Sequence, residues 1–152
     1  GGGVYADEKN RQIRICMGKR PLPLLIKTEP YPGFPTDLQS PFMAFLATAQ
    51  GTSYIEEQVF EGRFATAKIL EQMGAVIRTE DQRAVIEGHY PLKGAAVNAC
   101  DLRGGAALMV AALAAEGDTF IGECHHIERG YEDICRDMAA LGAHIRWVGK
   151  DS

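Results

Sequence analysis

One apolar run constrains the fold of this chain more than any other feature of its sequence. Residues 106–115 carry apolar side chains at every position, so a helix formed there has no face that prefers water. A bilayer-spanning helix needs about 20 residues, which makes this run too short to cross a membrane. We therefore predict a buried helix over residues 105–115, with the sheets packed outside it. In most α/β domains the helices form the outer layer instead.

A supersecondary unit occurs twice in the sequence. The matching segments are residues 49–57 and 115–123 (AQGTSYIEE and AEGDTFIGE), 61–64 and 127–130, 73–77 and 141–145, and 37–38 and 101–102. A third, partial copy opens the chain, because residues 2–4 and 12–15 resemble the last two strands of the first full copy. We therefore predict one partial domain over residues 1–152, made of the tail of one unit (1–28) and two further units (24–90 and 91–152).

Hydrophobic periodicity predicts the same element order, βαβαββ, in each unit. The predicted strands are residues 11–17, 24–28, 52–57, 75–79, 84–87, 95–99, 119–123 and 143–148. The predicted helices are residues 41–50, 65–73, 105–115 and 131–141. The predicted fold class is α/β (α+β), with repeated βαβαββ units, central buried helices and outer sheets.

A proline-rich tract leads into the first helix of the first full unit. Residues 30–35 hold three prolines, which excludes a helix or an interior strand. We predict a stiff, extended loop that delivers Asp37 to the start of the following helix. Two roles stay open for Asp37. It is either the N-cap of that helix, as its repeat equivalent Asp101 would be, or a positioned catalytic carboxylate.

Three arginines occupy the approaches to predicted helices. Arg63 and Arg129 are repeat equivalents between a strand and a helix, and Arg103 stands directly before Gly104-Gly105. A guanidinium beside a glycine-rich helix start suits a carboxylate, a phosphate or a diphosphate. Ordinary surface salt bridges are the alternative for each arginine taken singly. Together, the three favour an anion site.

Composition and charge argue against several classes of function. The formal net charge of −4 disfavours nucleic-acid binding, and no apolar run is long enough to span a membrane. His125 and His126 lie in a segment predicted to be extended, where they would point to opposite faces and form no metal site. The four cysteines show no C-x-x-C spacing, so we interpret them as reduced thiols of a cytoplasmic protein.

Five motifs, spread along the chain, resemble those of a bacterial enzyme family. They are PYPGFPTD at 30–37, FEGRF at 60–64, DLRGGAAL at 101–108, AEGDT at 115–119 and HIERGYE at 126–132. In this order they are similar to the UDP-N-acetylglucosamine 1-carboxyvinyltransferases, the enolpyruvyl transferases of peptidoglycan synthesis. The resemblance implies part of an inside-out α/β barrel lobe. We expect no cofactor and no metal.

The resemblance also implies roles for single residues. Asp37 would be the acid/base beside the 3-hydroxyl of UDP-N-acetylglucosamine, and would assist its attack on phosphoenolpyruvate and the later loss of phosphate. The Val59 backbone would contact the sugar nucleotide together with Asp37. Arg129 would face the phosphoenolpyruvate anion, with Arg63 and Arg103 lining the same cleft.

The chain departs from the family pattern in what it lacks. The family's N-terminal lobe, its lysine-asparagine pair and its proton-donating loop cysteine have no counterpart here. None of the four cysteines matches that motif; they are Cys16, Cys100, Cys124 and Cys135. We therefore expect a C-terminal fragment that is inactive alone and self-associates through exposed edges. The alternatives are a non-catalytic anion-binding or structural module, or another enzyme of the fold group, such as an RNA 3′-phosphate cyclase.

Overall fold

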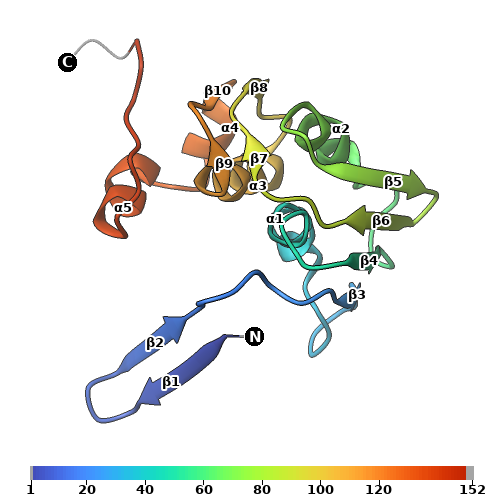
Figure 1. The fold of residues 1–152 in the computed structure, drawn as a ribbon, viewed down its shortest axis with the longest axis horizontal. Coiled ribbons are helices and arrows are strands. Elements are labelled where there is room, and N and C mark those ends of the chain that lie inside the picture. The colour runs from blue at the N-terminus through green and yellow to red at the C-terminus, as the bar shows by residue number, and fades with distance from the viewer. Residues whose placement is uncertain (1, 150–152) are drawn as a thin grey trace.

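The structure is a computed structural model, and it describes residues 2–149 (Figure 1). Its strands are β1 (Gly3–Asp7), β2 (Gln12–Cys16), β3 (Leu25–Lys27), β4 (Thr52–Glu56), β5 (Val76–Glu80), β6 (Arg83–Glu87), β7 (Leu92–Lys93), β8 (Ala96–Asn98), β9 (Ala115–Glu116) and β10 (Phe120–Gly122). Its helices are η1 (Thr36–Leu38, a 3-10 helix), α1 (Gln39–Leu46), α2 (Ala65–Gln72), α3 (Leu102–Leu113), α4 (His125–Glu128) and α5 (Ile134–Ala140). None of the helices within these residues is both long and apolar enough to span a bilayer.

The first full unit has the predicted order β3-α1-β4-α2-β5-β6. Its four strands form one sheet in the order β3-β4-β6-β5. β3 runs parallel to β4, whereas β6 is antiparallel to both of its neighbours. β6 therefore lies in the slot between β4 and β5, although it follows both of them in the chain.

The second unit repeats the element order of the first unit up to α5, but no strand follows α5 in the described residues. β8 and β10 pair in parallel, as β3 and β4 do, with α3 between them in the chain. The predicted strand at 143–148 is wrong, because these residues form no strand. Its repeat equivalent β5 pairs with β6, whereas residues 143–148 pair with no strand of the described chain. Without such a partner, no ladder of hydrogen bonds forms.

The core lies between α1 and α3, which pack against each other. Small side chains at the contact allow this close approach, since Ala47 of the α1 C-cap and Ala107 and Ala111 of α3 are fully buried. Leu46 and Leu108 are also completely buried. The helix predicted over 105–115 is therefore central, as expected, although Leu113 at its end is 58% exposed.

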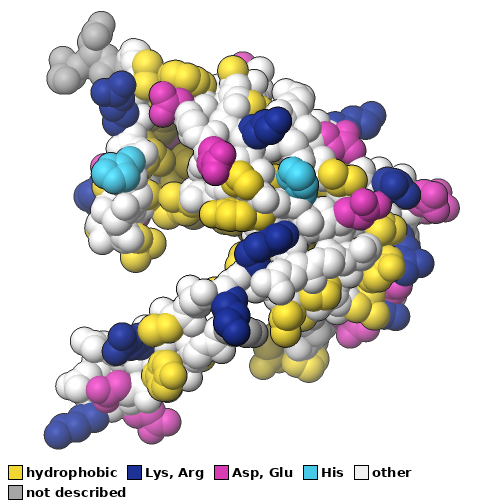
Figure 2. Space-filling model, in the orientation of Figure 1, with side chains coloured by type: hydrophobic (Ala, Val, Ile, Leu, Met, Phe, Trp, Pro, Cys, Tyr) yellow, Lys and Arg dark blue, Asp and Glu magenta, His cyan; other side chains and the backbone are white. Residues whose placement is uncertain are grey.

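The hairpin β1–β2 stands away from the rest of the molecule (Figures 1 and 2). Its register pairs Val4 with Ile15, just as β5–β6 pairs Ile77 with Ile86. The partial copy proposed at the start of the chain stays a prediction. The difference is burial: Ile77 and Ile86 lie in the core, whereas Val4 and Ile15 are about 70% exposed.

Candidate functional site

The proline-rich loop is folded back on itself rather than extended. The Gly33 N–H donates to the Pro30 carbonyl at 2.8 Å, and the Glu29 N–H donates to the Phe34 carbonyl at 2.9 Å. Phe34 then packs edge-on against Phe42 of α1, with ring centroids 5.0 Å apart. The prediction of an extended loop is therefore wrong. The loop is nevertheless fixed to the helix that follows it, because turn hydrogen bonds and an aromatic contact both hold it.

Asp37 lies in η1, directly before α1, and its carboxylate caps neither helix. Asp37 Oδ1 instead accepts a hydrogen bond from Arg103 Nε at 2.7 Å and lies 3.5 Å from an Arg63 terminal nitrogen. The repeat equivalent Asp101 behaves differently, since it caps α3 by accepting the Gly104 N–H at 2.6 Å. The structure therefore excludes the N-cap role that the sequence left open for Asp37.

The two guanidinium groups set the ionisation of Asp37. The hydrogen bond from Arg103 is the main cause that lowers the pKa of the Asp37 carboxyl, and the charge of Arg103 and the contact with Arg63 act in the same direction. Partial burial opposes them and raises the pKa, but the net shift is downward. Asp37 is therefore a carboxylate at neutral pH, although its side chain is 66% exposed.

A buried glutamate that no sequence motif singled out braces this site. Glu57 follows β4 and is completely buried. One carboxylate oxygen accepts the Thr28 hydroxyl at 2.8 Å and the N–H groups of Val59 and Phe60 at 3.0 and 3.1 Å. The other oxygen accepts the Thr36 hydroxyl at 3.0 Å. Glu57 thus ties the strand end to the residue next to Asp37. The only sequence signal for it was a charged residue directly after an apolar strand.

Thr36 links Glu57 to Arg63 through its hydroxyl group. The Thr36 hydroxyl donates to Glu57 and accepts a hydrogen bond from Arg63 at 2.9 Å. The Arg63 guanidinium also lies over the Phe60 ring, 4.3 Å from its centroid. A continuous chain of polar contacts therefore runs from buried Glu57 through Thr36 and Arg63 to Asp37. Arg103 closes it from the start of α3.

Arg129 lies near the start of α3, where α4 positions it. It follows α4 and is exposed. The next residue, Gly130, lies so close to Leu102 of α3 that a Cβ on the glycine would meet the Leu102 side chain at 2.6 Å. Arg129 is thus anchored beside Leu102, the neighbour of Arg103. Among the described contacts, none joins Arg129 to Asp37.

The implied contact of Val59 with the sugar nucleotide is restricted by the fold. The Val59 N–H already donates to Glu57 at 3.0 Å. A ligand contact through the Val59 backbone would therefore use its carbonyl oxygen.

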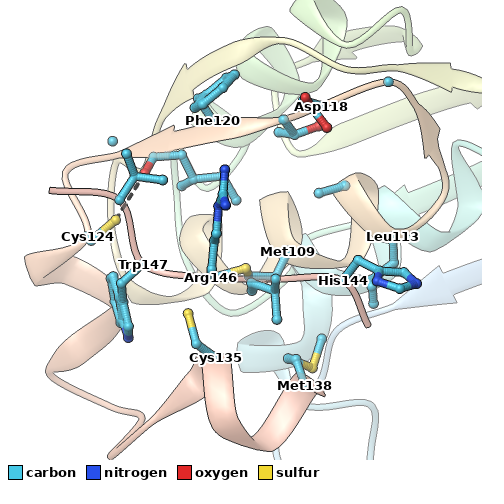
Figure 3. Close-up of a pocket in the computed structure, with 17 residues that line it drawn as sticks. Met109, Leu113, Asp118, Phe120, Cys124, Cys135, Met138, His144, Arg146 and Trp147 are labelled. Carbon is cyan, nitrogen blue, oxygen red and sulfur yellow. Dashed lines mark hydrogen bonds between the residues drawn. The ribbon is translucent and has the colours of Figure 1, made fainter. Parts of the chain in front are cut away.

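Asp37 and the arginines lie at the surface and do not line the groove at the C-terminal end of α3. A groove of about 430 Å³ lies elsewhere, between the C-terminal half of α3, β10, α5 and residues 144–148 (Figure 3). Asp37, Arg63, Arg103 and Arg129 are absent from its lining.

The histidine pair lies in α4, so the extended segment predicted for it is wrong. The His125 and His126 rings lie 4.0 Å apart, and His125 Nδ1 is 3.3 Å from a Glu123 carboxylate oxygen. Within residues 2–149, no group of three His, Cys, Asp or Glu side chains is placed to hold a metal ion. Within the described residues, no disulfide involves any of the four cysteines.

A family model matches nearly the whole chain. The model for EPSP synthase (3-phosphoshikimate 1-carboxyvinyltransferase) covers residues 2–138. This chain belongs to the EPSP synthase family. The match includes every residue of the Asp37 site described above.

Curated relatives carry the name that the sequence motifs suggested. The chain is 49% identical over 143 residues to a UDP-N-acetylglucosamine 1-carboxyvinyltransferase of Desulfofundulus thermocisternus, covering 94% of this chain and 59% of the relative. It is 50% identical over 148 residues to the Koribacter versatilis protein of that name, covering 97% of this chain and 34% of the relative. The resemblance is confirmed, and the chain spans only a third to three fifths of the relatives' length.

Solved structures show the fold. The enolpyruvyl transferase NikO of Streptomyces tendae matches with a TM-score of 0.83 and 32% identity, over 95% of this chain and 33% of that one. An EPSP synthase of Acinetobacter baumannii matches with a TM-score of 0.68 at 20% identity, over 98% of this chain and 35% of that one. The predicted fold class is confirmed: the chain forms part of an inside-out α/β barrel. Neither the binding-module alternative nor the RNA cyclase alternative is favoured.

Proposed function

We propose that this chain is part of an enzyme that transfers enolpyruvate from phosphoenolpyruvate to the 3-hydroxyl of UDP-N-acetylglucosamine, in the cytoplasmic stage of peptidoglycan synthesis. The observation that carries the proposal is the Asp37 carboxylate held between Arg103 and Arg63, in a chain about half identical to proteins named for that reaction. The isolated 152-residue chain is proposed to be inactive, because one part of a site cannot exclude water or align two substrates.

Asp37 acts on the sugar hydroxyl in this proposal. An ionised carboxylate can accept the hydroxyl proton as the oxygen attacks C2 of phosphoenolpyruvate, while C3 gains a proton from an acid other than Asp37 and the C2=C3 double bond becomes single. Loss of a proton from C3 then restores the double bond and expels phosphate. Arg103 and Arg63 contact the Asp37 carboxylate in this structure. Guanidinium groups also bind phosphate and carboxylate groups of a substrate. When an arginine turns to the substrate anion, Asp37 loses a cationic partner and its pKa rises, so it becomes a stronger base as the substrates arrive.

The remaining residues position the ligands. Arg129, beside the start of α3, faces the phosphoenolpyruvate anion, and the Val59 carbonyl meets the sugar nucleotide. Glu57 and Thr36 hold Asp37 and Arg63 in place through the hydrogen bonds described above.

Calorimetry with UDP-N-acetylglucosamine tests the proposal on the chain as it stands. We expect weak binding that Asp37→Asn reduces and that Asp7→Asn, a carboxylate exchange on the distant β1, leaves unchanged. Phosphate release from the two substrates together should stay at the uncatalysed level. No binding by the unaltered chain, or equal binding by the Asp37→Asn variant, would contradict the proposed site.

A further inference from the structure

The hydroxyl group of Thr36 lies between an anion and a cation. It donates a hydrogen bond to the buried Glu57 carboxylate at 3.0 Å, and it accepts one from Arg63 Nη1 at 2.9 Å. A carboxylate has no proton to donate, and a guanidinium group has no lone pair with which to accept. Since the hydroxyl has a single proton, that proton points to Glu57 and a lone pair of the oxygen points to Arg63. Thr36 is therefore a fixed acceptor for Arg63.

Asp37 and Thr36 compete for the same nitrogen of Arg63. Nη1 lies 2.9 Å from the Thr36 hydroxyl oxygen but 3.5 Å from Asp37 Oδ1. The longer distance exceeds the range of about 2.7–3.2 Å for an N–H···O hydrogen bond, whereas Arg103 Nε meets the same carboxylate oxygen at 2.7 Å. A hydrogen bond to a carboxylate is stronger than one to a neutral hydroxyl. A freely moving Arg63 would therefore favour Asp37, so its shorter contact with Thr36 indicates that it is held.

Both contacts that hold Arg63 lead back to Glu57. The Glu57 side chain is completely buried and accepts four hydrogen bonds, one of them from Thr36. Another comes from the N–H of Phe60 at 3.1 Å, and the Arg63 guanidinium lies 4.3 Å from the centroid of the Phe60 ring. A buried group whose hydrogen bonds are satisfied keeps its neighbours in place. The Arg63 side chain is accordingly only 20% exposed, against 38% for Arg103.

We propose that Thr36 is a positioning residue for the base of the proposed reaction. By accepting the Nη1–H of Arg63, its hydroxyl keeps that guanidinium from a direct hydrogen bond with Asp37. This leaves Arg103 as the direct cationic partner of the carboxylate within residues 2–149. The inference rests on the proposed function, in which Asp37 takes the proton of the sugar hydroxyl. A carboxylate bonded directly to two guanidinium groups would hold its charge more firmly and accept a proton less readily.

The charged groups around Asp37 set the direction of this effect. Arg103 comes from the start of α3 and Arg63 from the turn before α2, while Glu57 lies on the other side of Thr36. The hydrogen bond from Arg103 is the largest cause that lowers the pKa of the Asp37 carboxyl, and the contact with Arg63 lowers it less. Loss of the Thr36 hydroxyl would let Arg63 move to Asp37 and lower the pKa further. A general base works best with a pKa near the operating pH, so this change makes Asp37 a weaker base.

A carboxyl NMR titration of the 152-residue chain tests the proposal. Thr36→Val removes the hydroxyl and keeps the branched shape of the side chain, and we expect the pKa of Asp37 to fall below that of the unaltered chain. Thr36→Ser retains the hydroxyl and should leave the pKa unchanged. In an Arg63→Gln background, Thr36→Val should have no further effect on the pKa, because the cation that it releases is absent. If the valine variant does not fold, Thr36→Ala removes the same hydroxyl and takes its place.

A purely structural role for Thr36 would lower the stability of the valine variant without moving the pKa of Asp37. An unchanged or raised pKa in Thr36→Val, an equal fall in Thr36→Ser, or a fall that persists without Arg63 overturns the proposal. The titration needs no substrate, so its outcome is separate from that of the proposed function. A fall in the pKa with no binding of UDP-N-acetylglucosamine would support the role of Thr36 in holding Arg63 and contradict the proposed function. Binding with an unchanged pKa would do the reverse.

Discussion

Glu57 shows how a single buried charge can organise a surface site. A carboxylate without solvent is costly unless it is hydrogen-bonded, and four donors meet this one. Those donors come from the strand end, the proline-rich loop and the turn before Arg63. Three segments that are distant in sequence therefore share one acceptor, and the position of Asp37 depends on it.

Replacing this glutamate should be far more damaging than replacing its neighbour. We expect Glu57→Ala to lower the free energy of unfolding by about 3 kcal/mol or more, because several donors lose their acceptor in a buried place. Glu56→Ala is the matched control, since Glu56 makes only a partly exposed ion pair with Lys27 at 3.0 Å and should cost under about 1 kcal/mol. Urea unfolding of both variants measures the difference. Similar losses for the two would show that Glu57 braces nothing.

The ionisation of Asp37 can be followed directly by a carboxyl NMR titration against pH. We expect its pKa below the ordinary 3.8, and Arg103→Gln should raise the pKa more than Arg63→Gln, because Arg103 makes the closer contact. A lowered folded-state pKa contributes stability that is full above the ordinary value and is lost as the pH falls through the folded value. An unchanged pKa in Arg103→Gln would contradict the assignment of cause.

At the scale of elements, the start of α3 depends on small residues. A Cβ on Gly105 would lie 2.5 Å from Ile127 of α4, and a Cβ on Gly104 would lie 2.7 Å from the Cys100 sulfur. Glycine is normally unfavourable inside a helix. Here it lets α4 and the segment between β8 and α3 approach closely, which brings Arg129 to the same end of α3 as Arg103.

Gly105→Ala should therefore destabilise the protein, although alanine usually stabilises a helix relative to glycine. A Gly→Ala change within a helix ordinarily stabilises by about 1 kcal/mol, but Gly105→Ala should destabilise by about 1–3 kcal/mol because the new methyl overlaps buried Ile127. Gly18→Ala is the control, since nothing lies within 4 Å of its Cβ position. Thermal unfolding followed by circular dichroism compares them. A gain in stability for Gly105→Ala would mean that α4 is not held against α3.

At the scale of the whole molecule, stability is unevenly distributed. The core between α1 and α3 joins the two units, whereas the β1–β2 hairpin contributes no buried residue to it. Such peripheral elements open at low cost, and central ones open only on global unfolding.

Hydrogen exchange should report this distribution. The amides of β1 and β2 should exchange first, and those of α1, α3 and β4 should exchange last, because only the latter belong to elements with buried residues. Equal exchange rates for the hairpin and for the core elements would contradict this uneven stability.

The sequence by itself determined the features that repeat or that follow from solvent avoidance. The alternation of apolar residues fixed the first βαβαββ unit, and an apolar run without a polar face could only be a central helix. The motifs around Asp37, Arg63 and Arg103 indicated the family, because motifs are local and survive without coordinates.

Only the tertiary structure decided how equivalent residues diverge. Asp37 and Asp101 hold the same repeat position, yet one meets two arginines and the other caps a helix. The bracing by Glu57 and the absence of a strand at 143–148 were likewise beyond the sequence. In each case the outcome depends on which partner lies opposite in space, and a residue's own neighbours along the chain do not specify that partner.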